Sequence, residues 1–353
     1  MFRLRVFSTM AGKEVRLLFS ALVILAIILG TFPGCSTEET KLVHLKVVDL
    51  PYPSFTTFYI AQEEGYFAEQ GLEVEFVKFS SVTQSIPLLA QGELDVAAGS
   101  VSAGFFNAIE QGVNVKIVAG REYTTVARET AAFMVRKSLY ESGELDTVAE
   151  IEGRQIAMTC TACVNDFALT QILKTAGLTQ NDVNIVKLSA EDIVVALGNG
   201  GVDAALIGTP RKENIEDMGY GVFLTSFAQL MPDFQYAFMM FGPTMLGDNA
   251  ELGKRFMTAY LKGVRQYVQG KTERNLEIAQ KYTGFDRETL LEMSWNPVDV
   301  NGSIDVEDII AFQDWAYESG FVDKEISAEQ LIDTSFIDYA NGVLGPATET
   351  PVG

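Results

Sequence analysis

Strand-like and helix-like segments follow one another along residues 44–208, and their order occurs twice. The strand-like stretch VEFVKFS at 74–80 returns 109 positions later as VNIVKLS at 183–189. Each copy is preceded by a helix-like segment that ends in Gly-Leu. Each is followed by a second helix-like segment that ends in Gly-x-Φ-Asp, where Φ is apolar, and then by an apolar strand. A strand–helix–strand–helix–strand unit is typical of a parallel sheet with helices on its faces. We therefore predict two similar α/β lobes with a ligand cleft between them.

The same pattern sets approximate bounds for the elements. Strands are expected at 44–49, 73–79, 95–99 and 115–120 in the first lobe, and at 153–158, 183–188 and 204–208 in the second. Two apolar runs, Ala131–Val135 and Phe234–Gly242, are interpreted as strands that cross between the lobes. Helical segments after residue 249 are expected to return to the first lobe. The predicted organisation is a first lobe at 44–130, a second lobe at 131–238, and a helical second part of the first lobe at 239–345.

The repeat also locates equivalent loops at the carboxyl ends of the strands, where ligands of open parallel sheets bind and where the next helix presents free N–H groups. All of these loops contain side chains that can donate and accept hydrogen bonds. The candidate ligand-binding residues are Ser54, Thr56, Ser100, Ser102, Thr159, Thr161, Asn165 and Thr209. Ser and Thr are also common helix N-caps, so each hydroxyl has a purely structural alternative.

The N-terminal segment has a different character from the rest. Four basic residues precede the apolar run Leu17–Gly30, which is too short to span a bilayer comfortably. The segment resembles a bacterial lipoprotein signal, whose cleavage exposes a cysteine that is then lipidated. Here that residue is Cys35, although positions 32 and 33 depart from the usual pattern. We expect a signal peptide at 1–34, lipidation at Cys35 and a tether at 35–43. An uncleaved N-terminal anchor is the alternative.

The charge balance narrows the class of partner. The full chain has a formal net charge of −21, and without residues 1–34 it would have −24. Nucleic acid and anionic lipid should repel so acidic a chain. We therefore expect no nucleic-acid partner, and we expect the protein to be held at the extracytoplasmic face of the cell membrane only by its lipid anchor.

Residues 57–72 contain Ala61-x-x-x-Gly65-Tyr66-Phe67-x-x-x-Gly71-Leu72, which resembles the signature of solute-binding proteins for nitrate, sulfonates, taurine and thiamine pyrimidines. The Gly-x-Φ-Asp turns and Gly120 fit the same pattern. The resemblance implies a two-lobed type II periplasmic-binding-protein fold with a small molecule in the interlobe cleft. It also implies delivery of that molecule to the permease of an ABC importer. We expect a monomer that is not an enzyme and has no cofactor.

The class of ligand is predicted from the side chains near the cleft. Aromatic rings are frequent there, and their faces suit a flat heterocycle. The vitamin branch of the family, which the chain resembles in overall pattern, handles riboflavin and thiamine pyrimidine precursors. We predict riboflavin first and the pyrimidine precursor second, with ring faces from Phe55, Tyr123 and Tyr236. The alternative is a sulfonate, taurine or nitrate anion, for which Arg121 and Arg211 become central.

Several motifs bear on an enzymatic or metal-binding alternative. Cys160 and Cys163 form a C-x-x-C at a strand-to-helix turn, for which a local disulfide or two packed thiols are expected. They are too few for a closed zinc site. With His44 as the one histidine, no Ser-His-Asp set can be built. The pyrimidine synthases that resemble this family use a histidine and a cysteine-rich cluster that the corresponding segments lack. The polar turn at 299–305 fails the EF-hand pattern, so no metal site is predicted.

Overall fold

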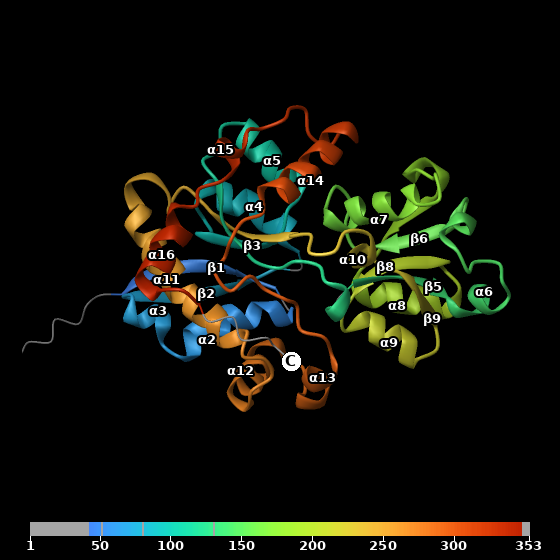
Figure 1. Cartoon of the computed structure of the whole chain (residues 1–353), viewed down its shortest axis with the longest axis horizontal. Coiled ribbons are helices and arrows are strands. Elements are labelled where there is room, and N and C mark those ends of the chain that lie inside the picture. The colour runs from blue at the N-terminus through green and yellow to red at the C-terminus, as the bar shows by residue number, and fades with distance from the viewer. Residues whose placement is uncertain (1–41, 51, 80, 130, 348–353) are drawn as a thin grey trace, which may run out of the picture. The chain divides into compact units, whose positions relative to one another are not determined.

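The computed structural model describes residues 42–347, with the exception of residues 51, 80 and 130. Its strands form two five-stranded sheets (Figure 1). The first sheet contains, in spatial order, β2 (Leu72–Lys78), β1 (Val43–Asp49), β3 (Val96–Ser100), β10 (Ala237–Phe241) and β4 (Lys116–Gly120). The second contains β7 (Asn184–Lys187), β6 (Gln155–Met158), β8 (Ala204–Gly208), β5 (Ala131–Arg136) and β9 (Gly221–Thr225). The seven strands predicted for the two copies of the repeat are confirmed within about two residues.

Helices connect these strands in the order that the repeat predicts. Those of the first copy are η1 (Pro53–Phe55), α2 (Thr56–Glu63), α3 (Tyr66–Glu69), α4 (Val82–Gln91) and α5 (Ala103–Glu110). Those associated with the second sheet are α6 (Lys137–Glu141), α7 (Val164–Lys174), α8 (Ala190–Asn199), α9 (Arg211–Asp217) and α10 (Phe227–Leu230). After β10 come α11 (Ala250–Tyr267), α12 (Glu273–Thr283), α13 (Arg287–Glu292), α14 (Val306–Glu318), α15 (Ala328–Leu331) and α16 (Ser335–Leu344). Short 3₁₀ turns, η2 (Val126–Arg128), η3 (Val148–Ile151), η4 (Gln180–Asp182) and η5 (Gly247–Asn249), complete the set.

The interpretation of the two apolar runs as crossing strands is wrong. β5 lies inside the second sheet, antiparallel to β8 and β9, and β10 lies inside the first, antiparallel to β3 and β4. The chain instead passes between the sheets at 121–129 and 226–236. In each sheet, one antiparallel strand directly follows a segment that comes from the other sheet. This strand is β5 in the second sheet and β10 in the first. Apolar patterning predicts that a run is buried, but not which sheet it joins.

The repeated aspartates have the same structural role in both sheets. Asp95 Oδ2 accepts a hydrogen bond from the Lys46 N–H at 2.7 Å, and Asp203 Oδ2 accepts one from the Gln155 N–H at 3.0 Å. Each aspartate therefore ties the turn before its strand to the first strand of its repeat copy, which is β1 for Asp95 and β6 for Asp203. Gly92, in the left-handed region at φ 73°, ends the helix that precedes the first of these turns. The Gly-x-Φ-Asp turns therefore recur because each ends a helix and fixes the next strand to its sheet.

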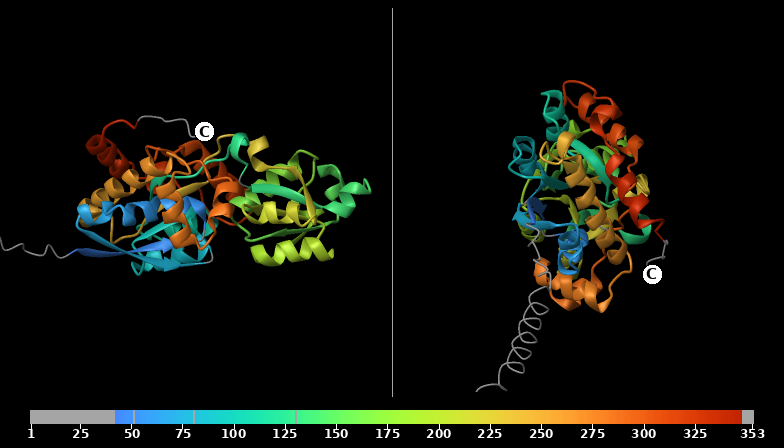
Figure 2. Two further views of the ribbon diagram at one scale, coloured as in Figure 1. Left: turned by 90° about the horizontal axis from the view of Figure 1, so that it is seen from below. Right: turned by 90° about the vertical axis from the view of Figure 1, so that its left-hand side faces the viewer.

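Figure 2 shows the orange and red C-terminal helices mainly beside the blue N-terminal part of the chain, and α14 contacts both α5 and α7. The ring of Phe312 on α14 lies 5.9 Å from those of both Phe106 on α5 and Phe167 on α7. Trp315 Nε1 donates to Thr170 Oγ1 on α7 at 3.0 Å. This aromatic contact joins the lobes independently of the two connecting segments. Within the described residues, no helix combines the length and apolar character that crossing a bilayer requires.

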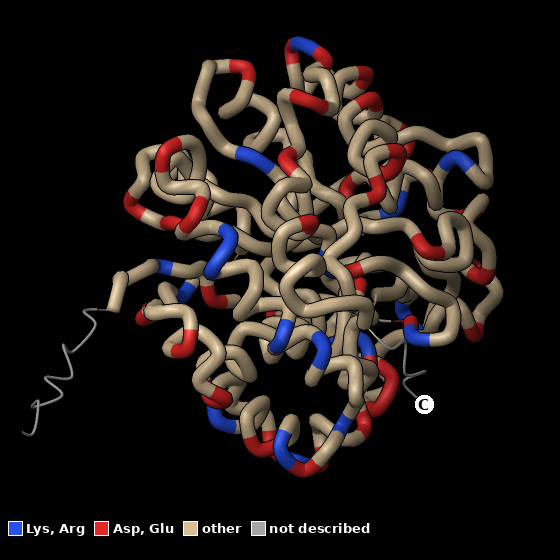
Figure 3. Tube along the Cα trace, turned by 60° about the vertical axis from the view of Figure 1, so that its left-hand side comes forward, with Lys and Arg blue, Asp and Glu red and all other residues tan. Residues whose placement is uncertain are grey.

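The acidic excess is not gathered in one segment of the trace. Figure 3 shows Asp and Glu on many separate stretches, with Lys and Arg between them. Several are ion-paired at the surface, such as Lys281 with Glu63 at 2.7 Å and Arg287 with Glu273 at 2.7 Å. Exposed pairs of this kind contribute little to stability. The net charge therefore does not by itself mark a binding site.

Candidate ligand-binding site

The loops after β3 and β6, both of which carry candidate residues, meet directly. Ser102 and Cys163 form an antiparallel bridge, and the Ala103 N–H donates to the Ala162 carbonyl at 3.0 Å. Ser102 is buried in this contact. Of the neighbouring candidates, Asn165 Nδ2 lies 3.5 Å from Thr159 Oγ1, at the limit of a hydrogen bond. The other candidates at strand ends are partly or fully exposed to solvent. They are Ser100 at the end of β3, Thr161 after β6 and Thr209 after β8.

The loop after β1 packs on a buried arginine. Arg121, directly after β4, is 0% exposed, and its guanidinium lies 4.8 Å from the Phe55 ring centroid. Its Nε donates to the Tyr260 hydroxyl at 3.0 Å and its Nη2 to the Ser54 carbonyl at 3.1 Å. Its Nη1 lies 3.3 Å from Glu122 Oε1. One face of the Phe55 ring is therefore occupied by Arg121, and the residue belongs to the core.

Two buried hydroxyls, Ser54 Oγ and Thr56 Oγ1, lack hydrogen-bond partners among the described residues, and Arg121 Nη1 has its ion-pair contact with Glu122 but no hydrogen bond among them. Buried polar groups are nearly always paired with protein or with ordered water. The hydroxyls can donate or accept, whereas the guanidinium N–H can only donate, so a water or a ligand oxygen is able to pair with any of the three.

A short hydrogen-bonded chain leads from this cluster to the first of two cavities. The Tyr236 hydroxyl donates to Glu122 Oε2 at 3.0 Å and accepts from Asn296 Nδ2 at 2.8 Å. The polar end of the predicted ring residue Tyr236 is thus engaged by protein. Asn296 belongs to the segment after α13, which also pairs with 121–123 through the Glu122–Val298 bridge. This chain places residues of the C-terminal part beside the segment that leaves the first sheet.

The first cavity, of about 800 Å³, lies beside the segment 123–128. Its lining includes the predicted ligand residue Tyr123, the cations Arg128 and Lys271, and the ring of Trp295. Burial lowers the pKa of Lys271, and the nearby Arg128 charge lowers it further. Lys271 Nζ donates to the carbonyls of Leu291 at 2.6 Å and Met293 at 2.8 Å, which hold it in place. Two mutually repelling cations at one cavity are suited to an anion.

Carboxylates also line this cavity. Asp233 and Glu292 are exposed to solvent, where their charges are screened. Asp299 Oδ1 is occupied by the N–H groups of Asn301 at 2.9 Å and Ser303 at 2.8 Å. Asp305 caps α14 through the N–H groups of Glu307 and Asp308, so the predicted polar turn with a helix N-cap is confirmed. Asp299 and Asp305 are thus engaged by backbone N–H groups of the protein.

The second cavity is a groove of about 650 Å³ between α8 and α9 in the second lobe. Arg211, one of the cations predicted for an anion site, lines it and is ion-paired with Glu191. Burial and the charge of Glu122 raise the pKa of Tyr52, and Arg211 opposes the shift. Tyr52 is nevertheless 47% exposed, a combination expected for a residue in a concave site open to water. The charge of Arg211 in the second lobe therefore acts on the Tyr52 hydroxyl of the first.

Cys160 and Cys163 form a disulfide, which is one of the two predicted outcomes. Within the described part of the chain, no group of three or more His, Cys, Asp and Glu residues could hold a metal ion. Cys35 lies outside the described residues. The sequence pattern predicted Tyr123 as a ligand residue but gave no indication of Lys271 or Trp295. These lie in the C-terminal helical part, which shows no repeat and gives no signal of proximity to the connecting segment.

Comparisons with known proteins address the fold and the family. The NMT1/THI5-like family model matches residues 52–272. A Brucella abortus protein named as a binding protein is 26% identical over 238 residues, which are 65% of this chain and 68% of the relative. A Bacillus subtilis protein named as an aliphatic sulfonates-binding protein is 22% identical over 334 residues, 90% of this chain and 96% of the relative.

Solved structures support the predicted two-lobed fold. The alkanesulfonate-binding protein SsuA from Xanthomonas axonopodis pv. citri, bound to MOPS, aligns with a TM-score of 0.65 at 16% identity, over 84% of this chain and 99% of its own. The nitrate-binding protein NrtA from Synechocystis aligns with a TM-score of 0.68 at 15% identity, over 88% and 92%. The desulfurization enzyme DSZB has the same fold, with a TM-score of 0.59 at 12% identity, over 86% and 99%. The fold thus occurs in binding proteins and in an enzyme. From the family match over residues 52–272, the chain belongs to the NMT1/THI5-like family.

Proposed function

We propose that this protein is the extracytoplasmic solute-binding component of an ABC importer and that it binds a sulfonate-type organic anion. The family and the names of its relatives support the binding role. An anion is preferred to riboflavin because similar proteins are named for the binding of sulfonates and nitrate. The single observation that carries the choice is the pair of cations, Arg128 and Lys271, at one cavity of about 800 Å³.

The physical argument concerns the free energy of those two charges. The proximity of Arg128 and burial both disfavour the charged form of Lys271. An anion bound between them would offset the repulsion and favour that form. Arg128 and Lys271 can donate to sulfonate oxygens in charge-assisted hydrogen bonds, and Tyr123 and Trp295 line the same cavity for the organic part. Its volume is in the range of small-molecule sites.

Other residues of the predicted set remain part of this proposal. The unpartnered hydroxyls of Ser54 and Thr56, close to Arg121, would accept or donate bonds to ligand or to ordered water. We place the candidates at the strand ends around the same ligand region, and Tyr52 with Arg211 at its border with the second lobe. The lipid anchor at Cys35, the monomeric state and the partner permease are proposed on the resemblance alone.

Titration calorimetry of the purified chain tests the ligand class. We expect ethanesulfonate or taurine to bind with micromolar or tighter affinity, and riboflavin and a thiamine pyrimidine to give no heat. Binding should weaken as salt concentration rises, because the attraction is between charges. Micromolar binding of riboflavin or the pyrimidine, with no heat from any anion, would restore the heterocycle as the ligand.

A matched pair of variants tests the cation. Lys271→Gln removes the charge and keeps a donor for the Leu291 and Met293 carbonyls. Lys324→Gln makes the same change at a side chain that is 74% exposed. We expect about tenfold or greater loss of anion affinity in Lys271→Gln, the equivalent of roughly 1.4 kcal/mol or more, and no change in Lys324→Gln. Equal affinity in both variants would remove Lys271 from the site.

A further inference from the structure

Ala162 has an unusual backbone conformation at the point where the two lobes meet. Its φ of 54° lies in the left-handed region, which costs free energy for a residue with a Cβ. A residue stays in such a conformation when its surroundings restrain it. Three restraints act here, and each has a different chemical origin.

The first restraint is covalent, because the disulfide between Cys160 and Cys163 closes the loop around Ala162. The second acts on the N–H of Ala162, which donates to Asp166 Oδ2 at 2.7 Å. Asp166 is itself held by Gln180 Nε2, at 2.6 Å from its Oδ1. Together these bonds fix the direction in which the carbonyl of Ala162 points.

The third restraint comes from the other lobe. The Ala162 carbonyl accepts the N–H of Ala103, the first residue of α5, at 3.0 Å. The first N–H groups of a helix have no partner within the helix. The Ala103 N–H finds its acceptor in the other lobe, at the Ala162 carbonyl. Beside it, Ser102 is paired with Cys163, which is 1% exposed.

Apolar packing continues the same contact one helical turn further along. Phe106 of α5 and Phe167 of α7 both lie 5.9 Å from Phe312 of α14, measured between ring centroids. The Trp315 indole on α14 donates to Thr170 on α7 at 3.0 Å. The amino ends of α5 and α7 and the body of α14 therefore form one interlobe block, with the disulfide loop at its end.

We propose that the Cys160–Cys163 disulfide braces this block by holding the Ala162 carbonyl against α5, and that the brace sets how far the two lobes can separate on this side. The role does not depend on which solute the protein carries. The disulfide is thus a conformational element of lobe closure as well as a stabiliser of the second lobe. An external dithiol that reduces the bond to two thiols, and is itself oxidised to a disulfide, should loosen the block.

Two variants remove different parts of the brace. Cys160→Ser with Cys163→Ser removes the covalent restraint and keeps similar side-chain volumes. Ala103→Pro removes only the donor N–H. Proline is favoured at the first position of a helix, and Ser102 before it has the extended conformation that precedes proline, with φ −148° and ψ 157°. Ala190→Pro is the matched control, because Ala190 is the first residue of α8 within the second lobe.

The chain has two tryptophans, which supply an internal comparison. The Trp315 indole reports on the contact between the lobes, whereas the Trp295 indole donates to Leu290 within the C-terminal part at 3.0 Å. Hydrogen exchange of both indole N–H groups, resolved by NMR in the ligand-free chain, measures the two contacts side by side. Small-angle scattering of the same samples measures the radius of gyration.

We expect exchange at Trp315 to accelerate about tenfold in the double cysteine variant and in Ala103→Pro, with Trp295 unchanged and a larger radius of gyration. Reduced wild type should behave like the cysteine variant, and Ala190→Pro like wild type. Unchanged exchange at Trp315 in both variants would overturn the proposal. Equal acceleration at Trp315 and Trp295 would also overturn it, because the disulfide would then act on overall stability. Failure to bind any anion would leave these results unaffected.

Discussion

Asp308 Oδ2, at the amino end of α14, accepts a hydrogen bond from the backbone N–H of Gln235 at 2.6 Å. Gln235 lies in the segment that returns from the second sheet to the first, directly before β10. Its side chain reaches the same region, with Nε2 donating to the Ser303 carbonyl at 2.9 Å and Oε1 accepting from the Asp305 N–H at 2.7 Å. These hydrogen bonds thus connect the start of α14 to the segment 226–236, which is the second connection between the lobes.

This relationship makes stability depend on pH. Burial raises the pKa of Asp308 to about 6, with further contributions from Asp305 and Glu307, while the Gln235 N–H opposes the shift. A carboxyl with a raised pKa binds its proton more tightly in the folded state. Its contribution to the free energy of unfolding is therefore present below about pH 4 and is lost as pH rises through about 6.

We therefore predict that Asp308→Asn is more stable than wild type at pH 7, by on the order of 1–2 kcal/mol, because the amide oxygen can still accept the bond without a buried charge. The difference should vanish near pH 4. Urea unfolding at both pH values measures it. Asp314→Asn, on the same helix and exposed, should show no such dependence. If Asp308→Asn differed from wild type in the free energy of unfolding by the same amount at pH 4 and pH 7, the raised pKa of Asp308 would be contradicted.

A second prediction concerns the buried pair of Arg121 and Glu122. Arg121→Met leaves the Glu122 carboxylate without its neighbouring cation, and should cost about 3–5 kcal/mol of stability. The double variant with Glu122→Gln should cost clearly less than the sum of the single changes, because no isolated charge then stays buried. Denaturant unfolding of the four proteins gives the coupling energy. Additive effects would show that the two side chains do not act as a pair.

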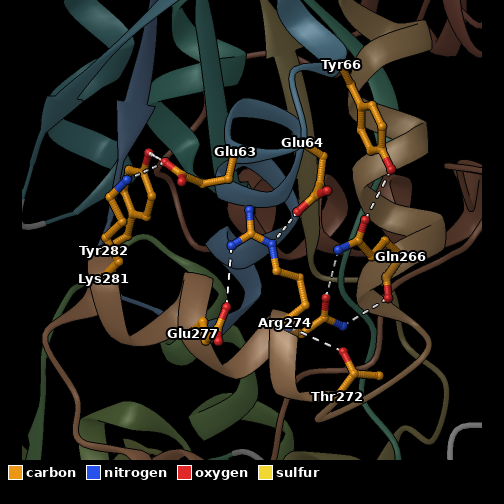
Figure 4. A network of polar contacts seen from close by, with 10 residues as sticks. Glu63, Glu64, Tyr66, Gln266, Thr272, Arg274, Glu277, Lys281 and Tyr282 are labelled. Atoms are coloured by element: carbon orange, nitrogen blue, oxygen red, sulfur yellow. Dashed lines mark hydrogen bonds and ion pairs between the residues drawn. The ribbon is translucent and has the colours of Figure 1, made fainter.

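Neighbouring residues on α12 should differ sharply in their effect on stability. Figure 4 shows Arg274 between Glu64 and Glu277, and its side chain is 48% exposed. Asn275 is 0% exposed, and its Nδ2 donates to the carbonyls of Gln266 at 3.0 Å and Gly270 at 2.8 Å. We predict that Asn275→Ala lowers the free energy of unfolding by about 1–3 kcal/mol. Arg274→Ala should lower it by less than about 1 kcal/mol. Equal losses in the two variants would contradict the distinction between buried and exposed partners.

The anchor prediction is tested in cells. Cys35→Ala should leave the protein as an unprocessed precursor or release it from the membrane, because a lipidated cysteine is the proposed tether. Membrane fractionation and intact mass report both outcomes, and Ser36→Ala serves as the neighbouring control. If Cys35→Ala were processed and still fractionated with membranes, the anchor would not be a lipid on this cysteine.

The predicted fold came mainly from the repeat, and specific residues explain why that was possible. The spacing of Gly92 and Asp95 matches that of Gly200 and Asp203 because each set ends a helix and ties the next strand to its sheet. These are local requirements, so they are visible in a short window of sequence. The strand β9 was not predicted, because it pairs only with β5 from a distant part of the chain.

The candidate site was predictable only in part, and Phe55 and Lys271 illustrate the limit. Phe55 lies in a loop that the repeat identified, yet its ring packs against Arg121 and Phe58 in the core. Lys271 lies in a part of the chain without a repeat, yet it lines the same cavity as Arg128. A strand end predicts which backbone reaches a site, but not the direction in which each side chain points once the neighbouring helices pack.

The sequence by itself determined the two α/β copies, their strand ends and the turns that close them, because apolar period, glycine and aspartate act over a few residues. Only the tertiary structure decided which sheets β5 and β10 join, that Arg128 and Lys271 line one cavity, and that the Ala103 N–H donates to the Ala162 carbonyl. These contacts join residues far apart in the chain. They depend on the rotation and docking of whole helices, which a local pattern does not specify.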